Sequence, residues 1–534
     1  MVNAVRSERS ILLKGALSAP LFLCHERRDM PASPLSPPVP SLAASALLGR
    51  PIPGGWLIAA LAAWLGIGQL LLWRFLDVMP LYAYGLGVIL IGFLAIATVR
   101  LTRGFAGPPL SMLLLCIGLA AVVLILGGEG RFFYANIDWQ VRFAALRDMT
   151  IHPWPFVYMR AEPEVLRAPV AMFLAPALIG KVAGERAGEI ALLVQNSLML
   201  GTVLALFMTL FDTRRARMVA LLVFFAFSGL DALGHLRIGA GLPGHLENWS
   251  DLQFSSTITL AFWVPNHALS GWIGAMSYLL WQQRKIPLAV ALTLLPLSAL
   301  WSPLGLIGAM PFALLAGART ILQRALRPSD ILLPALGTLI VVPALLYMAA
   351  AGESVGMRVA MISPIQWGIF EVLEVLVYIV PLFLLARTIR FGRDTLALVT
   401  VWLLVIPFIQ IGWSIDLMMR GSVTALTILA LMVADALDRE AQTRRVLILL
   451  LAIGSITGLA EIRRALVYPA APQVRCDIFA AWKRSFGDFP IYSYVAPLAQ
   501  MPATVRPVHP TPVAVTQTDR CWDGSWHHPD DPSG

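Results

Sequence analysis

The chain has 534 residues, of which 58% are hydrophobic and only 13% are charged, and its mean hydropathy is +0.74. Soluble domains carry about 25% charged residues, so this composition excludes an ordinary soluble protein and predicts an all-α polytopic membrane protein. The net charge of +9 does not indicate nucleic acid as a partner, because most arginines stand in short loops between apolar runs. The four cysteines include no CxxC pair, so no metal or redox motif is present.

The N-terminal region differs in composition from the rest of the chain. Residues 1–30 hold basic residues around a short apolar run that ends at Cys24, but the small-residue cleavage site of a signal peptide is missing. A spacer rich in proline and serine follows, PASPLSPPVPS. We predict that residues 1–53 are a disordered cytoplasmic leader or an over-extended start.

The central part of the chain, residues 54–460, is predicted to form the transmembrane domain. A membrane-spanning helix needs about 20 mostly apolar residues, and roughly 11–13 segments approach that length. The predicted spans are 54–73, 80–99, 109–128, 188–211, 217–231, 263–281, 286–301, 303–317, 330–350, 366–388, 395–412, 422–437 and 446–460.

Basic residues are concentrated in alternate loops between these spans, and the positive-inside rule places such loops in the cytoplasm. The N-terminus is then cytoplasmic, while a large loop at 129–187 and the C-terminal tail at 461–534 lie outside. This arrangement predicts a multi-pass membrane protein. The basic loops contain Arg100 and Arg103; Arg214, Arg215 and Arg217; Arg284 and Lys285; Arg319, Arg324 and Arg327; Arg387, Arg390 and Arg393; and Arg439, Arg444 and Arg445.

Residues 168–183 are apolar, but they are short and carry two prolines. If they crossed the membrane, every later loop would be inverted and the arginine-rich sequence DTRRAR would lie outside. We therefore predict a re-entrant or interfacial helix within the external loop, since half-spanning backbone is tolerated where it lines a protein cavity.

The external loop contains the strongest catalytic candidate, Asp138. If NIDWQVRFAALRDM is helical, Trp139, Phe143 and Leu146 share one apolar face, and the helix is expected to lie on the membrane surface. Arg142 is then one turn from Asp138. In that position it would hold a carboxylate that acts as a general base.

A structural role is the alternative for Asp138, and the residue types alone favour it. An acid in the first turn of a helix capped by Asn136 is stabilised by the helix dipole. Two further polar candidates stand in the same loop. They are Asp148, as a second acid, and His152, which precedes a WP turn.

A second polar region, residues 228–272, offers metal ligands. Asp231 and His235 are four residues apart, a spacing that would let them share a divalent metal, and His245 follows in a glycine-rich loop. No tight motif such as HExxH is present, and an interfacial loop with a tryptophan belt is the alternative. His267, shortly after a proline at the start of the next span, is a candidate for substrate binding.

Four further residues are candidates for substrate binding. Glu371 and Glu374 lie one turn apart near the outer end of a predicted span, where charged residues are costly and usually face a cavity. They would line a pocket for a sugar or phosphate, and an interfacial pair without a role is the alternative. Arg358 and Arg420 are external arginines that would bind a phosphate, with loop solubility as the alternative.

The C-terminal tail is polar and rich in proline at 502–512. Cys476 and Cys521 both lie in it. In an oxidising space they would pair, and two free cysteines are the alternative.

Taken together, many apolar spans and an acidic residue in a large external loop with amphipathic helices resemble the C-superfamily of integral-membrane glycosyltransferases. The sequences NIDWQVRFAALRDM…WPFVY, APALIGKVAGERAGE and FSSTITLAFWVPNHA are also similar to uncharacterised bacterial membrane proteins of that kind. The resemblance implies a polyprenyl-phosphate-linked sugar as donor, an external active site and an acidic base in the first large external loop. That acid is Asp138, with Asp148 second. Unlike in the family, the loop follows the third predicted span.

We therefore predict a membrane glycosyltransferase that uses a polyprenyl-phosphate-linked sugar, with membrane lipid as a further partner and an unknown acceptor. The alternatives are a transporter or flippase of a lipid-linked or polysaccharide precursor and a non-catalytic assembly subunit. No cofactor is certain, and a divalent metal stays open. The candidate residues are Asp138 and Asp148 for catalysis; Trp139, Arg142, His152, His267, Arg358, Glu371, Glu374 and Arg420 for substrate binding; and Asp231, His235 and His245 for a metal.

Overall fold

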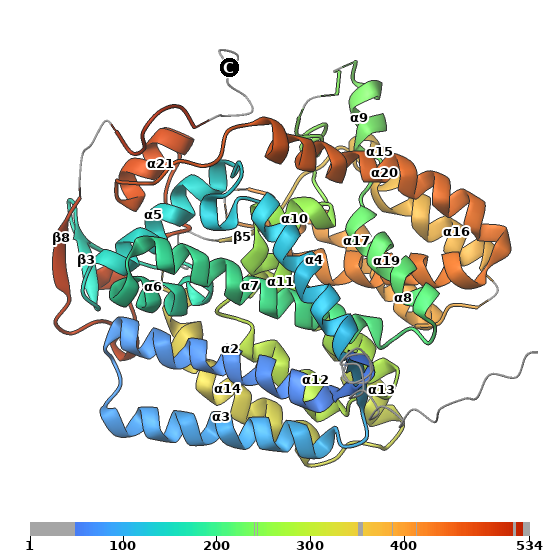
Figure 1. The fold of residues 1–534 in the computed structure, drawn as a ribbon, viewed down its shortest axis with the longest axis horizontal. Helices are drawn as coiled ribbons and strands as arrows, with labels where there is room; N and C mark the ends of the chain where they lie inside the picture. Colours follow the sequence, from blue (N-terminus) through green and yellow to red (C-terminus); the bar gives the residue numbers. More distant parts are fainter. Residues whose placement is uncertain are drawn as a thin grey trace, which may run out of the picture. The chain divides into compact units, whose positions relative to one another are not determined.

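The computed structural model describes residues 48–239, 241–242, 244–350, 356–386, 388–412, 414–515 and 520–526. The predicted leader therefore lies outside the described residues up to position 47. Within these ranges the protein has an all-α polytopic fold, with eight helical segments that are long and apolar enough to cross a membrane (Figure 1). They are α2 (Gly54–Leu76), α3 (Leu81–Leu101), α7 (Glu185–Met208), α8 with α9 (Arg214–Arg237), α13 (Pro303–Leu322), α14 (Ser329–Met348), α15 to α16 (Pro364–Leu385) and α20 (Ala441–Val467).

Two of these segments are interrupted. The first has non-helical backbone at 227–230, and the second contains a π-helical turn, η2. Their parts are α8 (Arg214–Ala226), α9 (Asp231–Arg237), α15 (Pro364–Glu371), η2 (Val372–Leu376) and α16 (Val377–Leu385).

Shorter helices complete the bundle, and every predicted span overlaps a helix. The predicted all-α polytopic class is confirmed, but among the described residues eight segments, rather than the roughly 11–13 predicted, are long and apolar enough to span a membrane. The agreement has a local cause, because proline and glycine punctuate the apolar runs. Pro80, Pro109 and Pro287, for example, stand directly before a helix. The shorter helices are α4 (Leu110–Leu126), α10 (Thr257–Trp263), α11 (Pro265–Gln282), α12 (Leu288–Leu297), α17 (Arg393–Val405), α18 (Asp416–Gly421) and α19 (Val423–Arg439).

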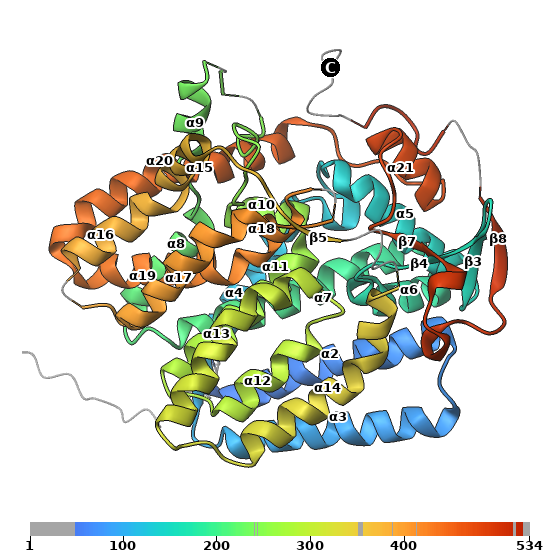
Figure 2. The ribbon, with the colours of Figure 1, turned by 180° about the vertical axis from the view of Figure 1, so that it is seen from behind.

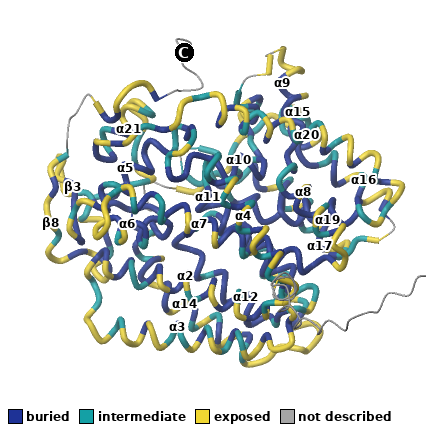
Figure 3. The backbone as a smooth tube through the Cα atoms, viewed as in Figure 1, coloured by how far each residue is buried: buried dark blue, intermediate teal, exposed yellow. Residues whose placement is uncertain are grey.

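The helices differ in how far protein covers them (Figure 3). α2 and α3 lie side by side, with α14 behind them in Figure 1 and in front of them in Figure 2, and α3 buries only Gly87, Ile91, Leu94 and Thr98. α7 and α11, by contrast, are buried along most of their length. An apolar helix with most of its side chains exposed needs a lipid environment, which fits a membrane protein.

The segment predicted to be re-entrant, 168–183, contains the 13-residue helix α6 (Ala171–Ala183). At about 1.5 Å per residue it is too short to cross a bilayer. The helix begins inside the bundle, where the Ala171 N–H donates to the Leu300 carbonyl (3.4 Å), and the chain turns back into α7 at Gly184. There φ is 91°, in the left-handed region that glycine tolerates. The segment is thus a short helical hairpin, and its re-entrant or interfacial position in a membrane stays a prediction.

The helix predicted for the external loop exists as α5 (Ile137–Ile151), but the expectation that it lies on the membrane surface is wrong. Its apolar face is buried in protein rather than against lipid, and Gln140 and Arg142 on the other faces are buried too. The reason is the C-terminal tail, whose helix α21 (Ile478–Phe486) packs on α5, with Ser485 Oγ donating to Gln140 Oε1 (2.6 Å). The amphipathic pattern did not indicate this partner.

Three small sheets tie the polar segments together. The four-stranded sheet, in the order β7–β4–β3–β8, joins two strands of the external loop to two strands of the tail, and its β3–β8 pair is parallel. The disulfide Cys476–Cys521 confirms the paired alternative for these cysteines. The strands are β1 (Pro51–Pro53), which pairs with β2 (Ala106–Pro109); β3 (Phe156–Met159); β4 (Pro163–Leu166); β5 (Met357–Val359), which pairs with β6 (Ile409–Ile411); β7 (Val495–Pro497); and β8 (Thr511–Ala514).

The polar loops gather at two opposite ends of the helices. At one end, loops predicted to be cytoplasmic meet, since Arg390 pairs with Asp212 (3.3 Å). At the other end, loops predicted to be external meet, since Arg167 donates to the Met348 carbonyl. The structure thus groups the loops as the alternation of charge predicted.

Candidate active site

The candidate site starts from Asp138 in the first turn of α5. The side chain of Asn136 caps this helix by accepting a hydrogen bond from the Asp138 N–H (3.0 Å). One turn later, Arg142 Nη2 lies 3.2 Å from Asp138 Oδ2; the Asp138 side chain is 23% exposed and that of Arg142 is 5% exposed. The helix cap and the ion pair are therefore both present, and the carboxylate is reachable although its partner is buried.

The start of α5 docks on the carboxyl end of α10. Asn136 Nδ2 and Trp139 Nε1 donate to the Phe262 carbonyl (2.9 and 2.7 Å), and Arg142 donates to the Trp263 carbonyl. The last carbonyls of a helix lack partners within it and carry partial negative charge, so an amide, an indole and a guanidinium suit this end. Trp139 is thereby a buried anchor rather than a surface residue for substrate.

Arg420 reaches the same place from α18. Burial lowers the pKa of Arg420 to about 10, the charge of Asp138 opposes this shift and the charge of Arg142 adds to it. Such charge effects act over several ångströms, so Arg420 lies near Asp138 and Arg142, and we group the three side chains as one cluster. Arg420 stays positive at neutral pH and pairs with Asp416, while its Nε lacks a hydrogen-bond partner in the part of the chain that the structure describes.

Tyr494, from the C-terminal tail, completes the cluster. Its side chain is hydrogen-bonded to Arg142. Burial raises the pKa of Tyr494, the charge of Arg142 lowers it and the charge of Asp138 raises it, so the phenol is neutral at pH 7. The Arg167 N–H donates to the Tyr494 carbonyl (2.7 Å) and fixes the backbone there.

His267, in the first turn of α11, faces the same cluster. It is 9% exposed, and its Nδ1 lies 2.7 Å from Ser302 Oγ, at the start of α13. The charges of Arg420 and Arg142 both act on its ring. The predicted residues Asp138, Arg142, His267 and Arg420 are thus brought together from three helices.

The cluster combines groups that suit an anion next to a reacting hydroxyl. Arg142 and Arg420 offer guanidinium donors, which recognise phosphate well. Tyr494 adds a neutral phenol, and Asp138 is a carboxylate able to accept a proton. Such a site can place a phosphate close to a general base.

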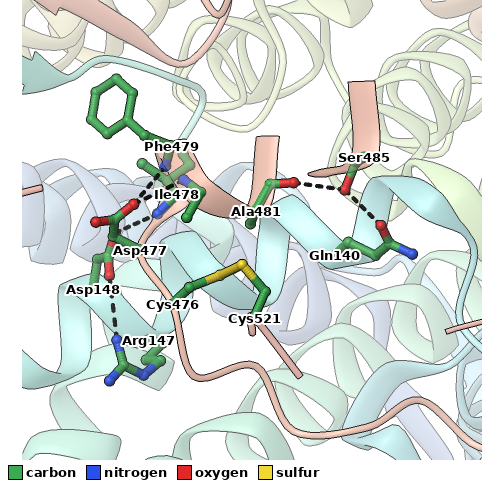
Figure 4. The surroundings of a disulfide bond; sticks show 11 residues. Gln140, Arg147, Asp148, Cys476, Asp477, Ile478, Phe479, Ala481, Ser485 and Cys521 are labelled. Carbon is green, nitrogen blue, oxygen red and sulfur yellow. Dashed lines mark hydrogen bonds and ion pairs between the residues drawn. A yellow bond between two sulfur atoms is a disulfide. The ribbon is translucent and has the colours of Figure 1, made fainter. Parts of the chain in front are cut away.

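Asp148, predicted as the second catalytic acid, lies elsewhere and has a structural role. It is fully buried in the second half of α5, where its Oδ2 accepts from Tyr158 (2.7 Å) and from the Ile478 N–H (3.0 Å). Figure 4 shows it at the start of α21, with Arg147 beside it. Burial raises its pKa to about 7, and the hydrogen bond from Tyr158 opposes the shift. The prediction relied on the residue type, which does not reveal that this side chain is buried and hydrogen-bonded.

His152 and Arg358 do not reach the cluster either. The His152 ring packs beside that of Phe156, with 5.4 Å between ring centroids, and its pKa is lowered by burial and then by the charges of Arg147 and Lys181. Arg358 is exposed on β5, where Nε donates to Gln410 (3.0 Å).

Glu374 belongs to a second polar cluster, inside the bundle, whereas Glu371 is buried without a hydrogen-bond partner for its carboxylate among the described residues. Trp249 Nε1 donates to Glu374 Oε1 and to Asp231 Oδ1, both at 3.2 Å. Asp231 also accepts from Thr457 (2.8 Å). Glu371 is buried one turn before Glu374. The two acids predicted to line a pocket are therefore enclosed by protein.

The predicted metal ligands do not converge. Asp231 is engaged in the cluster just described, and His245 Nδ1 lies 2.7 Å from Glu461 Oε1. Both ring nitrogens of the buried His235 lack a hydrogen-bond partner within the described residues. Among those residues, no group of three or more His, Cys, Asp or Glu side chains is arranged to hold a metal ion. The ligand set is therefore corrected, because a spacing of four residues on α9 did not bring the side chains to one point.

A network around Glu461 was missed by the sequence interpretation. Arg464 Nη1 lies 2.9 Å from Glu461 Oε1, and Trp263 Nε1 donates to Glu461 Oε2 (3.0 Å). Arg142 donates to the carbonyl of Trp263, whose side chain is held by Glu461. The network around Glu461 therefore helps to position Arg142. A charged pair three residues apart at the end of the last apolar run was a usable signal. Tyr494 had none.

Comparisons with protein-family models, with curated proteins and with solved structures found no match. Any functional assignment therefore depends on the geometry of the site.

Proposed function

We propose that the chain is a membrane glycosyltransferase that transfers a sugar from a polyprenyl-phosphate-linked donor to an acceptor. Asp138 acts as the general base. One observation carries the proposal. The partly exposed carboxylate of Asp138 stands beside Arg142, which is buried, and near Arg420, which is half-buried, in a protein whose helices suit a bilayer. A base and a phosphate-binding pair in one place match the two charged centres of this reaction.

The reaction divides between these groups as follows. The acceptor hydroxyl loses its proton to Asp138, and its oxygen bonds to the anomeric carbon of the sugar. The bond between that carbon and the phosphate oxygen breaks, and polyprenyl phosphate leaves with the electron pair. Arg142 and Arg420 stabilise the charge that develops on this leaving group. Attack opposite the leaving group inverts the anomeric configuration.

The location proposed for the protein is the bacterial inner membrane, with a cytoplasmic N-terminus and the site outside. Two observations support this orientation. The arginine-rich loops meet at the end of the bundle opposite the site, as the positive-inside rule requires. The tail carries the disulfide Cys476–Cys521, which persists in oxidising compartments.

The proposal is tested by product release from the purified protein in liposomes. A panel of undecaprenyl-phosphate hexoses and pentoses is supplied with a mixed-sugar and lipid acceptor extract, and free undecaprenyl phosphate is measured. We expect release with at least one donor and none from liposomes containing Asp138→Asn. The absence of release from every donor would contradict the proposal.

A second candidate function, transport of a lipid-linked precursor, is favoured by a different observation. The break at 227–230 and the π-helical turn η2 bring two buried acids, Asp231 and Glu374, to one indole within the bundle. Transporters place charged and broken helices in this way. Movement of an undecaprenyl-phosphate sugar between leaflets without its cleavage would favour this function.

A further inference from the structure

The C-terminal tail is attached to the rest of the protein by more contacts than an extension that only adds solubility would need. We call residues 474–526 the strap. In the described part of the chain it contains α21, β7 and β8, and its two ends are joined by the disulfide Cys476–Cys521, with 45 residues of sequence separation. Both cysteines are buried, and Figure 4 shows the disulfide close to α5. The strap is therefore a closed loop of chain attached to the helix that carries Asp138.

The strap follows α5 from one end to the other. Its hydrogen bonds reach the residue before the helix cap, the first half of the helix and the second half. They include Trp526 Nε1 to the Ala135 carbonyl (2.8 Å), Ser485 Oγ to Gln140 Oε1 (2.6 Å) and Ile478 N to Asp148 Oδ2 (3.0 Å).

The same segment delivers Tyr494 to Arg142. Directly after Tyr494, the strap pairs as β7 with β4, and the Tyr494 carbonyl accepts from Arg167. The Tyr494 side chain bonds to Arg142, which also contacts the Trp263 carbonyl and Asp138. Without the Tyr494 hydroxyl, Arg142 loses its bond to the strap.

We propose that the strap is a disulfide-locked part of the active site and that Tyr494 is a positioning residue, which holds Arg142 against Asp138. The expected effect on lipid binding rests on the proposed function. The expected effect on the reactivity of Arg142 does not rest on it. The two effects are measured separately.

The first measurement is the rate at which phenylglyoxal modifies Arg142 in the full-length protein in detergent, followed by peptide mass spectrometry. We expect Cys476→Ser/Cys521→Ser and Tyr494→Phe each to raise this rate several-fold, because both release a side chain that is only 5% exposed. Arg215, at 71% exposure on the opposite end, serves as an internal reference. Cys116→Ser and Tyr82→Phe, at an exposed tyrosine of α3, are the controls, and their rates should equal that of the wild type.

The second measurement is the Kd for undecaprenyl phosphate in the same samples. Loss of a hydrogen bond to a charged group should weaken binding by about tenfold in Tyr494→Phe. If Arg142 reacts in both strap variants at the same rate as in the wild type, the proposal is overturned. It is also overturned if the wild type and the strap variants bind the lipid equally tightly. If Arg142 becomes reactive but the wild type binds no undecaprenyl phosphate, the proposed donor fails and the locked strap stands.

Discussion

At the scale of single residues, two acids on one helix have opposite environments. Asp138 is partly exposed and faces Arg142, Arg420 and Tyr494, whereas Asp148 is fully buried and accepts hydrogen bonds from Tyr158 and the strap. Environment rather than residue type therefore separates the candidate base from the structural acid.

The burial of Asp148 makes stability depend on pH. Its folded-state pKa, about 7, lies above the ordinary 3.8, so the folded protein binds this proton more tightly than the unfolded chain. The resulting stabilisation is present below about pH 4 and is lost as the pH rises to about 7. At 1.36 kcal/mol per pKa unit, the loss is roughly 4 kcal/mol.

Asp148→Asn is expected to remove this loss, because the amide oxygen still accepts from Tyr158 and Ile478 but the side chain cannot ionise. The Tm of the variant in detergent should match that of the wild type near about pH 4 and exceed it near about pH 8. Glu247, whose pKa burial also raises to about 7, leaves a residual slope in both proteins. Parallel Tm curves across this range would show that Asp148 does not bind the proton.

At the scale of elements, close helix contacts position the site. α7 lies against α4 at Gly201, where an added Cβ would stand 2.5 Å from the Ile117 Cα. Small residues at such contacts let membrane helices approach closely. α7 packs against α6, and α6 packs against α5. The contact at Gly201 therefore supports the position of α5.

We expect Gly201→Ala to destabilise the protein by about 1–3 kcal/mol, since backbone and not a flexible side chain blocks the new methyl group. The matched control is Gly118→Ala on α4, where the added Cβ meets nothing within 4 Å. The measurement is the Tm of each variant in detergent. Equal shifts for the two alanines would contradict the close contact.

At the scale of the whole molecule, the fold sorts its polar loops into two ends, one of which holds the site. The proposed orientation is tested by single-cysteine labelling in a variant that lacks Cys24 and Cys116. A membrane-impermeant maleimide should label Glu162→Cys, at the turn between β3 and β4, in intact cells. Arg103→Cys should react only after the membrane is opened. The reverse pattern would place the site in the cytoplasm.

The sequence was sufficient for features that depend on neighbouring residues. Apolar runs and their prolines predicted where the helices lie, and a spacing of four residues predicted the ion pair between Asp138 and Arg142. The meeting of Asp138 with Arg420 and Tyr494 depends on packing between segments far apart in the chain, for which spacing carries no signal. The surface position expected for α5 was wrong for the same reason, because its cover comes from the strap.

The central claim is that Asp138 acts in chemistry rather than in binding or folding. Its most direct test compares turnover and donor binding in Asp138→Asn, with Asp77→Asn as a control, since Asp77 forms an exposed ion pair with Arg74 at the end of α2. We predict that Asp138→Asn binds undecaprenyl phosphate as the wild type does but releases it from a sugar donor at least about 100-fold more slowly. Unchanged release by Asp138→Asn would contradict the account.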